Sequence, residues 1–133
     1  MLVRCLSLVM SRWLASMSTR AAIGFALAEG GYTTIYSHYD GYPEHVGKIL
    51  KQFHNSDSAA RRVVGGSHIH HFDHDGVISR FGEGDAGGEN SQDMLEAICG
   101  YDYLYLWDFD QQKWRCFARD GYIKPTSLRE VEL

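Results

Sequence analysis

A mostly apolar run near the start of the chain, followed by a second strand-like run, predicts a pair of strands. The runs at 21–28 and 32–39 flank Gly30 and Gly31. A Gly-Gly pair between two such runs predicts a β-hairpin, because glycine readily adopts the positive φ that tight hairpin turns require. We therefore expect a hairpin at the N-terminal end of the folded chain.

A second strand pair is predicted near the other end, at 101–109 and 113–119, with a turn between them at 110–112. In its first strand Leu104 and Leu106 face one way and the aromatic side chains face the other. Apolar residues on both faces indicate a strand that is covered on both sides. A short strand is also predicted at 76–81, followed by an exposed acidic, glycine-rich loop at 81–90.

Helical spacing predicts the elements between the two hairpins. Val46, Ile49, Leu50 and Phe53 recur at i, i+3, i+4 and i+7 after Pro43, which suits a first helical turn. A second helix is predicted over 57–64, capped by Ser56 or Asp57 and ended by Gly65-Gly66. A third is predicted after Ser91, with Met94, Leu95 and Ile98 facing the core, and the tail after Pro125 is expected to add a helical turn.

These elements predict an α+β fold, a small antiparallel sheet made of the N-terminal and C-terminal hairpins with two or three helices packed on one face. A length of 133 residues suits one domain. Residues 1–16 differ in pattern from the rest of the chain, so we expect an N-terminal extension or an upstream start. The globular domain is expected to occupy 17–133, with Met17 as the natural first residue.

Charge and cysteine content limit the expected partners and the expected cellular compartment. The net charge of −4 and the scattered basic residues argue against nucleic acid as the main partner, since such binding needs a basic face. Arg12 interrupts the apolar N-terminal run, so no membrane association is expected. The three widely spaced cysteines predict free thiols in a reducing compartment, and we expect the protein in the cytoplasm of a host cell.

The most unusual segment is Ser67 to Asp75, which carries four histidines and two aspartates. Imidazole and carboxylate are ligands that zinc and other divalent metals prefer. The candidate metal ligands are His68, His70, His71, Asp73 and His74. The simpler interpretation is a polar loop with exposed histidines and no cofactor. Both interpretations stay open at this point.

A second candidate site lies at the predicted strand-to-helix junction, where the candidate binding residues are His38, Tyr39, Asp40, Tyr42 and His45. Three of these side chains would meet at a helix N-terminus, which favours anions. The alternative is a structural turn, in which Asp40 bonds nearby backbone N–H groups, Gly41 takes a positive φ and Tyr42 packs inward.

The segment S-H-Y-D-G-Y-P-E-H-V-G-K-I-L at 37–50 resembles a motif in small uncharacterised proteins of tailed phages, prophages and plasmids. The similarity continues in the M-S-T-R stretch at 17–20, in Phe72-Asp73, and in the D-Y-L-Y-L-W block at 102–107 with Trp114. This resemblance implies a phage or mobile-element protein but carries no activity, so the sequence leaves open whether the protein is an enzyme.

Two functions are expected from these observations. The first is an accessory protein that binds a host protein, for example as an anti-defence inhibitor of the anti-CRISPR kind, because tyrosine and tryptophan are favoured in interfaces. The alternative is a small metal-dependent hydrolase that uses the histidines and aspartates at 68–75, with Asp75 or Glu44 as general base.

Overall fold

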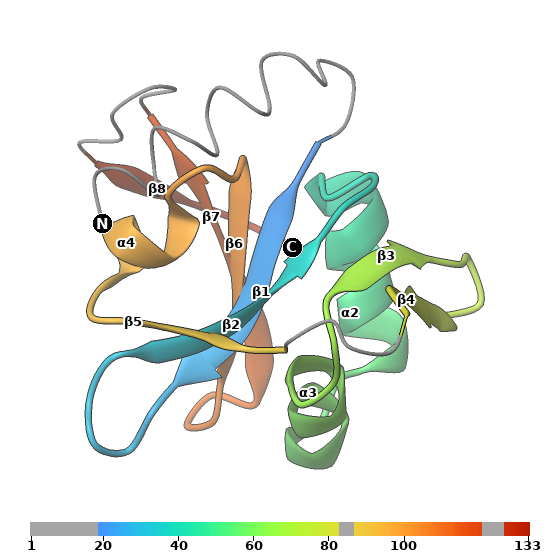
Figure 1. Ribbon diagram of the computed structural model, residues 1–133, viewed down its shortest axis with the longest axis horizontal. Helices are drawn as coiled ribbons and strands as arrows, with labels where there is room; N and C mark the ends of the chain where they lie inside the picture. Colours follow the sequence, from blue (N-terminus) through green and yellow to red (C-terminus); the bar gives the residue numbers. More distant parts are fainter. Residues whose placement is uncertain (1–18, 83–86, 121–126) are drawn as a thin grey trace.

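The two predicted hairpins form and lie side by side in one sheet (Figure 1). The computed structural model describes residues 19–82, 87–120 and 127–133. Residues 1–16 and Met17 lie outside the described residues. In chain order the elements are β1 (Ala21–Ala26), β2 (Tyr32–Ser37), η1 (Pro43–Gly47), α2 (Lys48–Phe53), α3 (Asp57–Val64), β3 (Ile69–Phe72), β4 (Ile78–Arg80), β5 (Glu89–Ser91), α4 (Met94–Ile98), β6 (Tyr103–Asp108), β7 (Lys113–Arg119) and β8 (Leu128–Val131).

The α+β class is confirmed, but the sheet is larger than expected and mixed. Its strand order is β4-β3-β2-β1-β6-β7-β8, with β5 paired to β2. β1 and β6 run parallel, from the pair Ala21 and Tyr103 to the pair Phe25 and Trp107. Each hairpin is antiparallel within itself, as predicted. The parallel contact arises where the hairpins meet, a long-range pairing that local turn signals do not specify.

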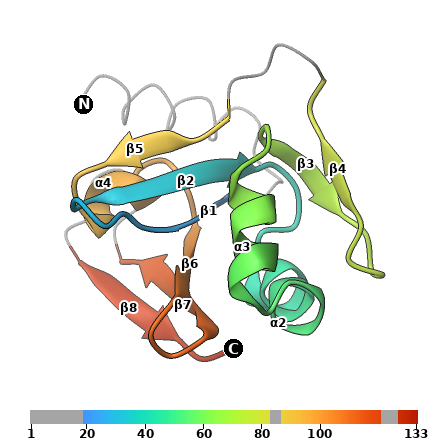
Figure 2. The same cartoon turned by 90° about the horizontal axis from the view of Figure 1, so that it is seen from below.

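The helices cover both faces of the sheet rather than one (Figure 2). η1, α2 and α3 pack on the face that carries Ile23, Tyr105 and Trp107. α4 packs on the opposite face, against Leu104 and Leu106. This distribution corrects the expected single layer of helices. It also explains the two-sided apolar pattern of β6, since each face of that strand contacts a different layer.

Local signals place most of the helix ends correctly. Ser56 caps α3, because its Oγ accepts a hydrogen bond from Ala59 N at 3.1 Å. For α4 the cap is Asp93 rather than the expected Ser91, with Glu96 N donating to Asp93 Oδ1 at 2.8 Å. Phe53 and Leu95, both predicted to face the core, are partly exposed.

Other expectations need correction at the C-terminus and at the cysteines. The tail forms strand β8 in place of a helical turn, while 121–126 lie outside the described residues. The predicted loop at 81–90 includes strand β5. Cys116 is a buried free thiol, but Cys99 takes part in a disulfide, which contradicts the expectation of three free cysteines.

Candidate functional site

The structure joins the two candidate segments of the sequence into one region. β3 runs parallel to the end of β2, with Ser37 paired to Ile69. His38 N then donates to Ile69 O at 2.9 Å, and Tyr39 N donates to His70 O at 3.2 Å. Residues 38–45 and 68–75 therefore form neighbouring walls of a single site.

Between these walls lies a surface depression of about 680 Å³, which we call the His–Asp depression. A volume of this order suits a small ligand or one side-chain cluster of a protein partner. Its lining residues are Tyr39, Asp40, His45, His71, Phe72, Asp73, His74 and Asp75.

His45 and His74 form one side of the His–Asp depression. His45 is held in η1, and its Nε2–H donates to Phe72 O at 3.0 Å. The His74 ring stands edge-on to the His45 ring, with the ring centroids 5.5 Å apart. The hydrogen bond to Phe72 O fixes the His45 tautomer, so Nδ1 of His45 is its remaining acceptor.

A chain of polar contacts links His70, His71 and Asp73. The Nδ1 atoms of His70 and His71 lie 2.8 Å apart, and His71 Nε2 lies 3.2 Å from Asp73 Oδ1. Both contacts are satisfied when Nε2–H of His71 donates to Asp73 and Nδ1–H of His70 donates to His71. This arrangement orients His71 in the same way that a carboxylate orients an imidazole in acid–base and metal sites.

His68 and His38 point toward Tyr36 instead. His68 Nδ1 accepts a hydrogen bond from Tyr36 N at 2.9 Å, and His38 Nδ1 contacts the Tyr36 hydroxyl group. The pKa of His38 is lowered, first by burial and then by the positive charges of Arg20 and His70. These two histidines therefore contact Tyr36 at the junction of β2 and β3, and neither lines the His–Asp depression.

The predicted metal ligands are consequently divided among three settings. His68 contacts Tyr36, His70 and His71 form a chain with Asp73, and His74 faces His45. Within 19–82, 87–120 and 127–133, no three His, Cys, Asp or Glu side chains lie close enough to hold one metal ion. β3 covers only Ile69–Phe72, so His68, Asp73 and His74 lie outside the strand, and the register of β3 shifts between Ile69 and His71. The metal site stays a prediction.

The turn at 39–42 differs from the structural turn that the sequence suggested. Asp40, not Gly41, takes the positive φ, at 54°. Gly41 is required for space, since a Cβ there would lie 2.9 Å from Ala21 Cβ. Tyr42 is 37% exposed rather than packed inward.

Of the two proposed general bases, Asp75 lines the His–Asp depression, whereas Glu44 lies elsewhere, beside Lys48 and Leu133.

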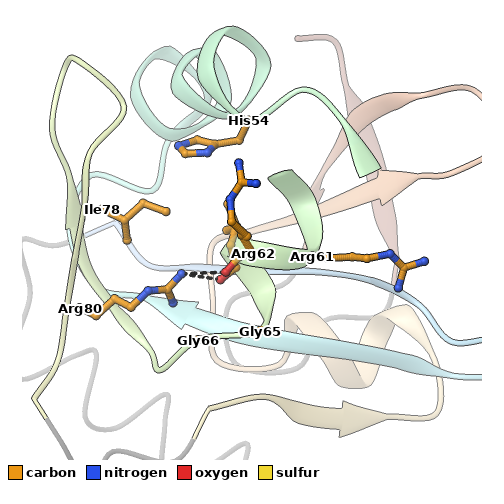
Figure 3. A pocket seen from close by; sticks show the side chains of 8 residues that line it. His54, Arg61, Arg62, Gly65, Gly66, Ile78 and Arg80 are labelled. Atoms are coloured by element: carbon orange, nitrogen blue, oxygen red, sulfur yellow. Dashed lines mark hydrogen bonds between the residues drawn. The ribbon is translucent and has the colours of Figure 1, made fainter. Parts of the chain in front are cut away.

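A second depression was missed by the sequence reasoning. It lies between α3 and β4 and is bordered by His54, Arg62 and Arg80 (Figure 3). The sequence offers only one local signal for it, the adjacent pair Arg61-Arg62. Arg80 joins the site through contacts across the fold, which spacing along the chain does not reveal.

Comparison with known proteins assigns no family. No family model matches the sequence, no curated protein is significantly similar to it, and no solved structure matches the fold. The resemblance to small phage and plasmid proteins therefore stays a prediction. None of the described helices is long and apolar enough to cross a membrane.

Proposed function

We propose that this chain is an accessory protein of a phage or mobile element that acts by binding a host protein. Inhibition of a host defence effector is the concrete form that we propose for this activity. The binding surface is the His–Asp depression together with the exposed apolar side chains that surround it.

The observation that carries this proposal is the clustering of exposed apolar side chains. Five large hydrophobic residues in the described part of the chain are exposed. Tyr39 lines the His–Asp depression, and Tyr42 lies beside its lining residue His45. Phe53 and Val77 lie at Gly76, the chain neighbour of its lining residue Asp75. We call these four, Tyr39, Tyr42, Phe53 and Val77, the apolar rim. Exposed apolar side chains that gather in one place, and are flanked by polar groups, are typical of protein interaction sites.

Local contacts relate the members of the apolar rim to residues that line or adjoin the His–Asp depression. The Tyr42 ring lies 6.2 Å from the His45 ring, and Tyr39 lines the His–Asp depression directly. Phe53 packs against Gly76, where a Cβ would lie 2.5 Å from the Phe53 Cγ atom. Val77 follows that glycine and is 54% exposed.

The polar groups inside the apolar rim suit a protein partner as well. Tyrosine offers a large rigid surface and a hydroxyl group, and aromatic side chains contribute strongly to interface energy. His71 and Asp73 are already oriented by their mutual contact at 3.2 Å. Little ordering of these side chains is then needed on binding, which lowers the entropic cost of association.

Co-purification from a host lysate tests the proposal. The full chain is compared with a Tyr39→Ser/Val77→Ser variant, which removes two apolar rim side chains, and with Leu95→Ser. Leu95 is the matched control, because it is the exposed hydrophobic residue on α4, away from the apolar rim. We expect one host protein to be retained in stoichiometric amounts by the wild type and by Leu95→Ser, and lost by the double variant.

The captured protein is then purified and mixed with each variant for size-exclusion chromatography. A defined complex with the wild type and Leu95→Ser, and none with the double variant, supports the proposal. Equal retention by all three proteins would contradict the proposed surface. If folded wild-type protein retains no partner, the proposed function fails.

A metal-dependent hydrolase is the second candidate, favoured by the presence of His45, His71, Asp73 and His74 in the lining of one depression. In that case His71 and His74 would contribute ligands and Asp75 a general base. Elemental analysis of chelator-free protein tests this alternative. One equivalent of zinc, manganese or iron, lost in His74→Ala together with phosphoesterase activity, would favour the hydrolase over the binding protein.

We also propose that the protein acts in the host cytoplasm. The disulfide at Cys99 argues against this location, since disulfides are rare in reducing compartments, so the state of Cys99 in cells tests the proposal. Cells are quenched in acid, and the denatured protein is alkylated before mass spectrometry. Alkylation of Cys99 as well as Cys116 supports a reducing location. Alkylation of Cys116 with Cys99 protected would contradict it.

A further inference from the structure

The depression between α3 and β4 has a volume of about 600 Å³ and is lined largely by basic side chains (Figure 3). We call it the basic depression. Its lining residues are His54, Arg61, Arg62, Val63, Gly65, Gly66, Ile78 and Arg80. All of them belong to the described part of the chain, and none is acidic. In a protein with a net charge of −4, such a concentration of positive charge is local and unbalanced.

Arg80 is held rigidly at the back of the basic depression. Its Nη1 donates to Ser67 O, and its Nη2 donates to Val63 O at 3.0 Å and to Arg62 O at 3.1 Å. Gly66 makes this position accessible, because a Cβ on residue 66 would collide with the Arg80 Cζ atom. The guanidinium group is therefore fixed before any ligand arrives, which reduces the cost of binding.

Arg62 and His54 face each other across the basic depression, as Figure 3 shows. His54 Nε2–H donates to Gly76 O at 2.9 Å, which leaves Nδ1 directed away from that bond. Burial lowers the pKa of His54, the hydrogen bond to Gly76 opposes this effect, and the positive charges of Arg62 and Arg80 lower the pKa further. His54 is therefore a partly buried histidine beside two positive charges.

We propose that the basic depression binds an oxyanion in front of Arg80, held by Arg62 and by the protonated ring of His54, whose Nδ1–H then donates to the anion. Guanidinium groups match the geometry of phosphate and carboxylate oxygens, and charge-assisted hydrogen bonds of this kind are the strong ones. A bound anion supplies the negative charge that the lining residues lack. The oxyanion is either a free phosphate or a carboxylate, and the two sources are separated by the choice of probe.

The proposal does not rest on the host-protein function, because inorganic phosphate alone tests it. Sodium phosphate is titrated into ¹⁵N-labelled full chain at constant ionic strength, with chloride as the replaced anion. We expect saturable shifts of the Gly65 and Gly66 amides, and a rise in the pKa of His54 on saturation. A parallel titration with acetate shows whether a carboxylate is accepted as well.

The matched variants are Arg62→Gln and Lys48→Gln, which each remove one positive charge from an exposed helical position. Lys48 lies on α2 and is not among the residues that line the basic depression. We expect Arg62→Gln to weaken phosphate binding about tenfold, the effect of losing one charge-assisted hydrogen bond. Lys48→Gln should change phosphate binding by less than about twofold, since exposed charges outside the depression are screened.

Saturation by either probe, together with selective loss in Arg62→Gln, supports the site. Phosphate binding without acetate binding assigns it to phosphate groups, and binding of both extends it to carboxylates. Shifts that grow linearly with anion concentration would overturn the proposal. So would equal weakening in the two variants, or a His54 pKa that phosphate leaves unchanged.

Discussion

The hydroxyl group of Tyr105 donates a hydrogen bond of 2.6 Å to the carbonyl oxygen of Gly41. Tyr105 lies fully buried in β6, whereas Gly41 belongs to the turn that presents Tyr39 and Asp40 to the surface. This single bond links the central strands to the His–Asp depression. The geometry of the proposed binding surface therefore depends on a buried core residue.

We predict that Tyr105→Phe destabilises the protein by about 1–3 kcal/mol, the cost of leaving a buried acceptor without its donor. Urea unfolding followed by circular dichroism measures this loss. Tyr103→Phe is the control, because it makes the same chemical change at a partly buried position of the same strand. Equal losses in the two variants would show that the bond to Gly41 is not responsible. The affinity for a captured partner should also fall in Tyr105→Phe.

A second prediction concerns Asp57 at the start of α3. Its Oδ1 accepts hydrogen bonds from Trp107 Nε1 at 2.8 Å and from Gln112 Nε2 at 2.7 Å. These bonds, that from Trp107 first, lower the pKa of the carboxyl group below its usual 3.8. Stability from the ionised form is therefore present above pH 3.8 and is lost as the pH falls through the lower pKa of the folded state.

We expect Asp57→Ala to lower the urea midpoint at pH 7 and to flatten the decline of that midpoint in acid. Asp57→Asn retains an oxygen that accepts from Trp107 and should keep more of the midpoint at pH 7, while losing the same pH dependence. Midpoints measured from pH 7 to pH 3 check both effects. An unchanged acid profile in both variants would refute the role of this carboxylate.

A third prediction concerns the carbonyl groups at the end of α3. Replacing Arg80 with Gln removes the guanidinium that bonds to Arg62 O, Val63 O and Ser67 O. We expect a loss of about 2 kcal/mol in the free energy of unfolding, in line with hydrogen bonds made by charged groups. Gly66→Ala should also be destabilising, because its Cβ would displace the same guanidinium. Arg62→Gln, on the exposed side of the helix, should remain close to wild type in stability.

The fourth prediction is a loss of stability in mild acid. The pKa values of His54 and His38 are both lowered, principally by burial. Below pH 6.5 the unfolded chain therefore binds protons at these histidines more readily than the folded chain does. We expect the free energy of unfolding to fall from pH 6.5 toward the lower pKa values of the folded state. His54→Gln should reduce that slope, and an identical slope in the variant would contradict the assignment.

The sequence correctly predicted turns and helix caps, which depend on residues that are close together along the chain. Gly30 and Gly31 both take positive φ in the first hairpin, and Ser56 caps α3 as expected. The parallel pairing of β1 with β6 depends instead on which hairpin edges meet, so no local pattern specified it. No local pattern specified the position of α4 either. It packs on the second face of the sheet, where it covers the other side of β6.

The sequence predicted two separate candidate segments, 38–45 and 68–75, and the structure places them side by side. His45 and His74 were chosen from separate segments, and they meet because β3 adds to the end of β2. The candidate metal ligands were drawn from one short segment, but the strand within it covers only Ile69–Phe72, so these side chains have different local surroundings. Arg80 could not be placed from sequence, since its partners are carbonyl oxygens of α3.

The parallel contact between β1 and β6 also governs how the protein is made. Ala21 has no partner on that side until Tyr103 has left the ribosome, so most of the chain is synthesised before the middle of the sheet closes. Contacts between residues so far apart in sequence slow folding. During translation the N-terminal hairpin has an open hydrogen-bonding edge on β1, and unpaired strand edges of this kind tend to pair with other chains.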